Sequence, residues 1–260
     1  MKVSFFVTCL TDTFYPRVGQ AVVAVLEHLG HEVEFREAQT CCGQPMFNTG
    51  CHGDAAALAR KMIDVFDDAD VVVTPSGSCC AMIHDYYEDL LGDDPHYGPR
   101  AKEMVGKTHE FAKFLLDVEK VDLAELGCRW PGKLTYHYSC HLRGLGMRDE
   151  AVRLLNQIEG VELVPLEKTE QCCGFGGTFA VKYPQISGSM VRDKVDCVKK
   201  TGADVLVCND GGCSLNITGS LHREQVPVMT KHLAEIIAEG LGLLPIEAPS
   251  PGTATQGVTS

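Results

Sequence analysis

Eight of the thirteen cysteines in this chain fall into two sets of four with the same spacing. A shift of 131 residues superimposes the first three members of each set, including a Cys-Cys-Gly group that occurs twice, and a shift of 134 residues superimposes the fourth. The pairs are Cys9 with Cys140, Cys41 with Cys172, Cys42 with Cys173, and Cys79 with Cys213. Because internal repeats of this length reflect repeated structural units, the spacing indicates two copies of one fold.

The segments between these cysteines alternate between strand-like and helix-like patterns. Short apolar runs predict strands over 2–8, 31–36 and 70–74, and over 133–139, 161–166 and 203–207. Helical periodicity predicts helices over 54–68, 147–159 and 187–201, and a further helix with Val18, Val22, Val25, Leu26 and Leu29 on one face. This alternation predicts an α/β fold made of two duplicated halves, each with a parallel sheet and helices on both faces.

The repeat also predicts the domain boundaries. We expect a first half over 1–127 and a second over 133–245, joined by the Gly- and Pro-containing segment between them. Residues 246–260 are small and polar with two prolines, and predict a disordered tail.

Composition limits the partners that this chain can have. The net charge of -12 and the pI near 5.2 disfavour nucleic acid and anionic membrane surfaces, which such a charge would repel. No stretch approaches the roughly 18 consecutive apolar residues of a membrane-spanning helix, and the N-terminal apolar run is shorter than the about 7 to 15 residues of a signal peptide core. We therefore expect a cytoplasmic protein, in which cysteines stay reduced and free to bind metal.

The paired cysteines follow the predicted strands. Since the carboxyl ends of parallel strands meet at one edge of a sheet, each half should gather four thiols there. Four thiolates at one point repel one another unless a cation holds them, so we expect a metal centre in each half. The predicted ligands are Cys9, Cys41, Cys42 and Cys79 in the first half and Cys140, Cys172, Cys173 and Cys213 in the second.

An iron–sulfur cluster fits this pattern better than zinc. Structural zinc sites usually take cysteines in pairs separated by two to four residues, whereas the pairs here are adjacent. Clusters accept thiolates from separate loops, and the glycines after each pair would let backbone N–H groups approach the sulfur atoms. Two clusters, of the four-iron type, are the expected cofactors.

The same residues resemble a known family. The string "CCGFGGTFAVKYPQISGSMVRDKV" at 172–195, with "FFVTC" at 5–9 and "CCGQP" at 41–45, is similar to the cysteine-rich CCG-domain iron–sulfur proteins, which carry this pattern twice. The resemblance covers nearly the whole chain except its tail. It implies an iron–sulfur electron-transfer subunit of a complex that oxidises L-lactate to pyruvate, with a ferredoxin-type iron–sulfur subunit and a small companion subunit as partners.

The chain departs from the fullest form of the family pattern, which ends each half in Cys-x-x-Cys. Ser76 and Asp210 stand at the positions of the missing thiols and become candidate oxygen ligands or hydrogen-bond partners. Cys80 and Cys208 are the alternative replacements, and Cys197 reads as a small core residue. The cluster type is therefore open, and so is any direct chemistry on a substrate.

Two other functions are compatible with the sequence. An iron–sulfur subunit of another hydroxy-acid dehydrogenase, such as glycolate oxidase, would share the clusters, although such a subunit is expected to carry an additional ferredoxin-like cysteine module. A zinc-stabilised interaction module would use the same thiols without redox activity. No Ser-His-Asp arrangement or phosphate-binding loop stands out, so no catalytic residue is predicted.

Overall fold

A computed structural model describes residues 1–247 and contains two four-stranded parallel sheets of identical topology. The strands of the first half, in the order β2-β1-β3-β4, are β1 (Lys2–Phe5), β2 (Glu32–Phe35), β3 (Val72–Thr74) and β4 (Thr108–Glu110). Those of the second, in the order β6-β5-β7-β8, are β5 (Arg129–His137), β6 (Glu159–Val164), β7 (Val205–Cys208) and β8 (Met229–His232). The predicted duplicated α/β fold is confirmed.

Helices cover both faces of each sheet. In the first half they are α1 (Cys9–Phe14), α2 (Pro16–His28), α3 (Gln44–Asn48), α4 (His52–Val65), α5 (Gly77–Leu91), α6 (Tyr97–Lys107) and α7 (Phe111–Lys113), which a π-helix (Phe114–Val118) extends. In the second half they are a 3₁₀ turn (Cys140–Arg143), α8 (Glu150–Asn156), α9 (Thr178–Lys182), α10 (Pro184–Thr201), α11 (Gly211–Arg223) and α12 (Leu233–Gly240).

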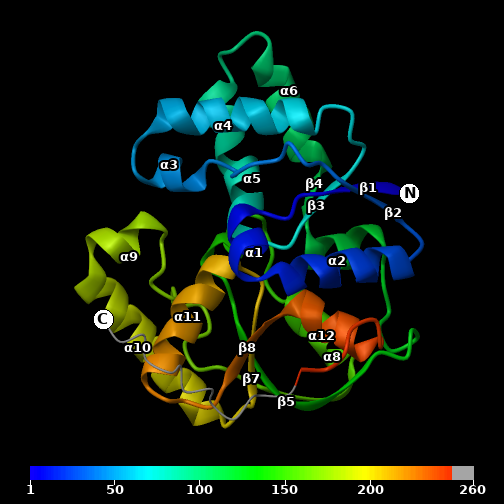
Figure 1. The fold of residues 1–260 in the computed structure, drawn as a ribbon, viewed down its shortest axis with the longest axis vertical. Helices are drawn as coiled ribbons and strands as arrows, with labels where there is room; N and C mark the ends of the chain where they lie inside the picture. The colour runs from blue at the N-terminus through cyan, green and yellow to red at the C-terminus, as the bar shows by residue number, and fades with distance from the viewer. Residues whose placement is uncertain (248–260) are drawn as a thin grey trace, which may run out of the picture.

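Three hydrophobic cores follow from the alternation of side chains along the strands. Phe6 and Val72 point to one face of the first sheet and pack against α4, α5 and α6, which lie together at the top of Figure 1. Val3, Phe5 and Val73 point to the other face, into a central core that both halves share. A third core lies between β7 and the helices α10 and α11.

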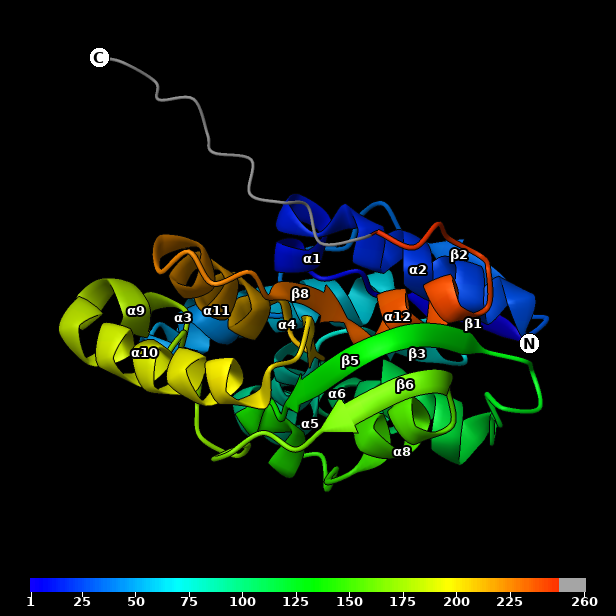
Figure 2. The ribbon, with the colours of Figure 1, turned by 90° about the horizontal axis from the view of Figure 1, so that it is seen from below.

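The central core joins the two halves. Helices α2 and α12 pack side by side between the sheets, as Figures 1 and 2 both show, and α7 packs on α8 in the equivalent way. Helices α2 and α8, each of which leads into the second strand of its half, therefore contact the last α-helix of the other half. This exchange is the pattern expected of two units related by an approximate two-fold axis.

Polar contacts between the halves repeat the same symmetry. Glu110 ends β4, caps α7 and accepts a hydrogen bond from the Asn209 side chain of the other half at 3.1 Å. His232 ends β8, caps α12 and contacts the carbonyl oxygen of Pro75 at 2.8 Å. All four residues occupy corresponding positions in the repeat, so each half contributes the same kind of contact.

Several predicted elements differ from the structure at their ends or were missed. The predicted helix 147–159 is shorter, because α8 ends at Asn156 and β6 begins at Glu159. The fourth strand of each sheet was not predicted, and neither were α5 and α11. The predicted joint at 127–133 contains the start of β5, and residues 248–260 of the predicted tail lie outside the described residues.

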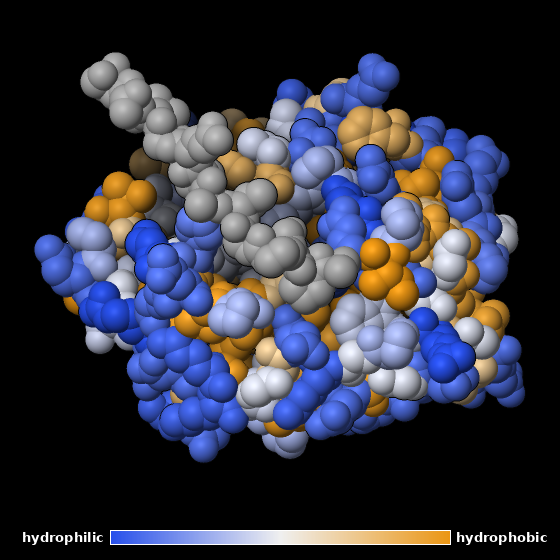
Figure 3. All heavy atoms as spheres, turned by 60° about the horizontal axis from the view of Figure 1, so that its bottom comes forward, coloured by the Kyte–Doolittle hydropathy of each residue, from blue (hydrophilic) through white to orange (hydrophobic). Residues whose placement is uncertain are grey.

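None of the helices within residues 1–247 combines the length and hydropathy needed to cross a bilayer. On the face seen in Figure 3, hydrophilic and hydrophobic residues are interspersed over the described part of the chain.

Candidate metal centre

All eight paired cysteines line one cavity between the two halves, with a volume of about 180 Å³. Cys9 and Cys140 start the short helices after β1 and β5, and the Cys-Cys pairs lie in the loops after β2 and β6. Cys79 and Cys213 lie in the first turns of α5 and α11. The structure thus brings each predicted set of four together, and it adds that both sets face the same cavity.

Thiols within each set are close enough to share protons. Hydrogen bonds from Cys42 and Cys9 lower the pKa of the Cys41 thiol to about 3, while those of its two donors are raised. In the second half, Cys140 and Cys173 lower the pKa of Cys172 in the same way, to about 2.

Cys173 also lies against the fourth member of the second set. Its Sγ is 3.2 Å from that of Cys213, and this hydrogen bond is the main cause that lowers the pKa of Cys213 to about 6. Hydrogen bonds to the neighbouring cysteine, burial and nearby negative charge raise the pKa values of Cys9, Cys42, Cys140 and Cys173. A bound metal would allow all four thiols of a set to become thiolates.

The glycine after each cysteine pair aims its backbone N–H at sulfur. The amide nitrogens of Gly43 and Gly174 lie 3.5 Å and 3.3 Å from the Sγ atoms of Cys41 and Cys172. Both glycines have left-handed backbones, with φ of 95° and 85°, which residues with a Cβ seldom adopt. A Cβ on Gly174 would also lie 2.8 Å from a backbone oxygen of α10. Glycine is therefore required here by conformation and by space.

Two helix N-termini point at the cavity. Ser76 caps α5 and Asp210 caps α11, and each accepts a hydrogen bond from the backbone N–H of the cysteine three residues later. The positive end of each helix dipole therefore lies beside Cys79 and Cys213, where it would stabilise the negative charge of a bound group.

The two capping residues also bond to each other across the interface between the halves. One oxygen of Asp210 accepts hydrogen bonds from the backbone N–H groups of Gly212 and Cys213, and the other accepts from Ser76 Oγ at 3.2 Å and from the backbone N–H of Ser78 at 2.9 Å. Both carboxylate oxygens are occupied. The arrangement favours the hydrogen-bonding role of Ser76 and Asp210 over ligation.

The other five cysteines do not line the cavity. Cys80 and Cys208 are buried away from the cavity lining, and burial raises the pKa of both thiols well above the usual value. Their positions do not favour them as replacements for the missing thiols. Cys197 is a core residue of α10, as predicted. Cys128 is buried in the central core, and Cys51 is exposed.

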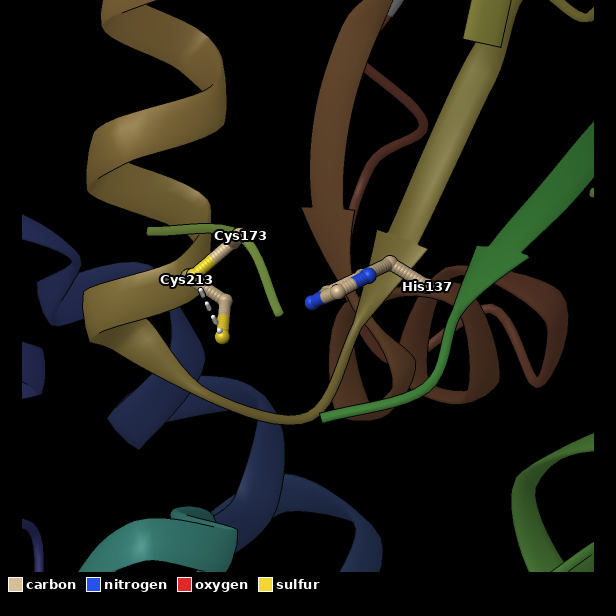
Figure 4. Close-up of side chains that lie close together, drawn as sticks. All are labelled: His137, Cys173 and Cys213. Carbon is tan, nitrogen blue, oxygen red and sulfur yellow. Dashed lines mark hydrogen bonds between the residues drawn. The ribbon is translucent and has the colours of Figure 1, made fainter. Parts of the chain in front are cut away.

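His137 is a candidate site residue that the sequence analysis missed. It ends β5, is fully buried, and places a ring nitrogen within 4.8 Å of the sulfur atoms of Cys173 and Cys213 (Figure 4). The available signal was its position: a polar residue in a buried strand, three residues before the first cysteine of its set. His141, in contrast, lies 3.8 Å from the Sγ of Cys140 at the cavity wall.

Comparison with known proteins identifies the fold unit. The CCG cysteine-rich domain matches the chain twice, over residues 3–84 and 134–218, so that each match contains one set of four cysteines. The chain belongs to the CCG cysteine-rich domain family. The two matched regions have the same strand order in the structure, and the loops that carry the cysteines are those that face the shared cavity.

Relatives within this family extend over almost the full chain. Lactate utilization protein A of Halalkalibacterium halodurans is 50% identical over 238 residues, which cover 91% of this chain and 96% of the relative. The protein of the same name from an Exiguobacterium species is 46% identical, with coverage of 92% and 98%.

One solved structure shows the same fold. A hypothetical protein from Helicobacter pylori superimposes on 93% of this chain with a TM-score of 0.64 and 11% identity. This chain spans about half of the length of that protein, 49%. At such low identity the likeness concerns the fold alone.

Proposed function

We propose that this protein is an iron–sulfur electron-transfer subunit of a complex that oxidises L-lactate to pyruvate in lactate utilization. The observation that carries the proposal is the convergence of the eight paired cysteines on one cavity, in a chain about half identical to lactate utilization protein A over most of its length. The proposed ligands are the four cysteines of each set, and the proposed cofactors are two four-iron clusters.

The residues at the cavity fit such a group. Each set offers four sulfur atoms from three separate loops, which suits a multi-iron cluster better than a single zinc ion. Backbone N–H groups and two helix N-termini surround the thiols and would stabilise the negative charge of a cluster with its thiolates. When bound, an iron–sulfur cluster accepts and releases single electrons.

A partner is needed, because no residue at the cavity forms a recognisable dehydrogenase site in the described part of the chain. Helices α1 and α3 line the cavity, and α9 and α10 follow the lining loop 175–177. Exposed apolar side chains occur on all four of these segments: Phe14 on α1, Met46 on α3, Val181 on α9, and Tyr183 and Ile186 at the start of α10. We infer that these elements contact the ferredoxin-type and companion subunits. A partner docked there would sit beside the proposed clusters.

The first test combines metal content with growth. Protein purified without oxygen should contain about eight irons and eight acid-labile sulfides per chain. Deletion of the gene should abolish growth on L-lactate but not on pyruvate, and the wild-type gene should restore it. Complementation should fail with Cys173→Ser and succeed with Cys51→Ser, since Cys51 is exposed and does not line the cavity.

The outcomes separate the alternatives. Zinc without sulfide would refute the electron-transfer function and leave a metal-stabilised interaction module. Iron and sulfide with normal growth of the deletion strain on L-lactate, but not on glycolate, would replace lactate by another hydroxy acid.

A further inference from the structure

The two cysteine sets have different surroundings at one position. The shift that superimposes Cys9 on Cys140 also superimposes Phe6 on His137. Both side chains are fully buried at the end of the first strand of their half, since Phe6 directly follows β1 and His137 is the last residue of β5. Phe6 packs edge-on against Phe66, with ring centroids 6.0 Å apart, and belongs to an apolar core. The first set therefore has an aromatic hydrocarbon where the second has an imidazole.

Among the residues that the structure describes, His137 has no hydrogen-bond partner for either ring nitrogen, although both are buried. Such unpaired groups are rare in native proteins, because a buried polar atom that has lost water needs another partner. Figure 4 shows the imidazole extending from β5 toward the sulfur atoms of Cys173 and Cys213. The missing partner is therefore expected on the side of these two cysteines.

His137 can supply a further donor to the thiolates of the second set. The N–H of Gly174 serves Cys172, the backbone N–H of Phe175 serves Cys173, and the backbone N–H of Cys213 is bonded to Asp210. When Cys173 and Cys213 lose their protons, their sulfur atoms become acceptors only. A neutral imidazole has one N–H donor, and its ring lies close enough for a small side-chain movement to complete the bond.

We propose that His137 donates a hydrogen bond to a thiolate of the second metal centre, Cys173 or Cys213, and thereby makes this centre easier to reduce than the centre of the first half. The inference rests on the proposed function, since it requires metal in both halves. Hydrogen bonds to ligand sulfur withdraw negative charge from a cluster and raise its reduction potential. Phe6 has no such donor, so the two centres would differ although their four cysteines match.

The test is an anaerobic redox titration of the full-length protein, followed by electron paramagnetic resonance. The variant His137→Phe copies the first half. We expect one of the two midpoints to become more negative, with the ratio of reduced to oxidised centre at fixed potential falling about tenfold, which is about 59 mV for one electron. The other midpoint should stay in place. His137→Gln, which keeps an N–H donor, should show a smaller change.

A spectroscopic signature separates hydrogen bonding from packing. In protein labelled with ¹⁵N-histidine, pulsed electron paramagnetic resonance of the reduced second centre should show a weak nitrogen coupling. The coupling should vanish in His137→Phe and remain in the matched variant His141→Phe, which removes the histidine beside Cys140. If His137→Phe fails to retain metal, the coupling in the wild type and the titration of His137→Gln still decide.

Three results bear on the proposal in different ways. Wild-type protein without iron and sulfide would refute the proposed function itself. Two centres in the wild type, with unchanged midpoints in His137→Phe and no nitrogen coupling, would overturn only the role of His137. A coupling as strong as that of a metal-bound imidazole would also overturn the hydrogen bond, because it would make His137 a ligand.

Discussion

Burial of a carboxyl group between the two halves predicts a defined pH dependence of stability. Glu110 is fully buried, caps α7 through the backbone N–H groups of Ala112 and Lys113, and accepts a hydrogen bond from Asn209. Desolvation by burial raises its pKa from 4.5 to about 7, despite these hydrogen bonds. The carboxylate is therefore costly to form in the folded protein above neutral pH.

The sign and the size of the effect follow from proton linkage. Below pH 4.5 both the folded and the unfolded chain bind the proton, and Glu110 imposes no penalty. Between pH 4.5 and about 7 only the folded chain keeps it, so the free energy of unfolding falls as pH rises. At 1.36 kcal/mol per pH unit, the full penalty above pH 7 is about 3 kcal/mol.

Glu110→Gln should remove this penalty. Glutamine cannot ionise, its carbonyl oxygen can still cap α7, and its amide can donate to the Asn209 oxygen, which has no partner in the wild type. Relative to the wild type, the variant should gain about 3 kcal/mol in free energy of unfolding between pH 4.5 and pH 8. Urea unfolding of both proteins at each pH measures this difference, and effects of other groups cancel.

A variant at an exposed position provides the control. Glu125→Gln changes the same functional group on the surface, and its stability relative to the wild type should not vary over this pH range. The reasoning would be refuted if the difference between Glu110→Gln and the wild type were also constant with pH, or if the variant became relatively less stable at pH 8.

Three further predictions concern the centre, the core and the surface. Gly174→Ala places a Cβ in a left-handed backbone against α10, so the purified protein should lose about half of its iron. The control Gly53→Ala, at a position in α4 where a Cβ meets no neighbouring atom, should keep its iron. Full iron content in both variants would contradict the glycine requirement. Lys231→Met removes a buried ion-pair partner of Glu239 and should lower the free energy of unfolding by about 3 kcal/mol, as measured by urea unfolding. A loss below about 1 kcal/mol would show that the ion pair contributes little to stability. Val181→Lys, at a side chain that is 81% exposed, should weaken binding to partner subunits in co-purification without changing iron content, and unchanged binding would exclude α9 from the interface.

The repeat was sufficient to predict the architecture. Matching cysteines and matching apolar runs predicted two copies of one parallel α/β unit, and the structure confirms this topology. The fourth strands were missed because they are short and their residues, Thr-His-Glu in β4 and Met-Thr-Lys-His in β8, form no apolar run like that of β3. Helices α5 and α11 were missed because glycine and serine residues, which are typical of loops, surround their first turns. The N-cap residues Ser76 and Asp210 therefore did not stand out as helix starts.

The shared cavity could not be predicted, because it depends on how the halves pack rather than on either half alone. Neither the contact of Ser76 with Asp210 nor that of α2 with α12 leaves a pattern in one sequence. His137, in contrast, could have been predicted from the sequence. Aligning the halves by their cysteines gives His137 the same position as Phe6, and a polar residue at a buried position that is apolar in the other half indicates a functional role.

The contact between Ser76 and Asp210 has a consequence for the history of this fold. These residues occupy equivalent positions, so in an ancestral homodimer of single units each would have met its own copy across the two-fold axis. Two aspartates there would have placed like charges in contact, and two serines would have placed no carboxylate at either helix N-terminus. In a single chain the two positions can differ. The hydroxyl–carboxylate pair is thus an asymmetry that a homodimer of identical units cannot have.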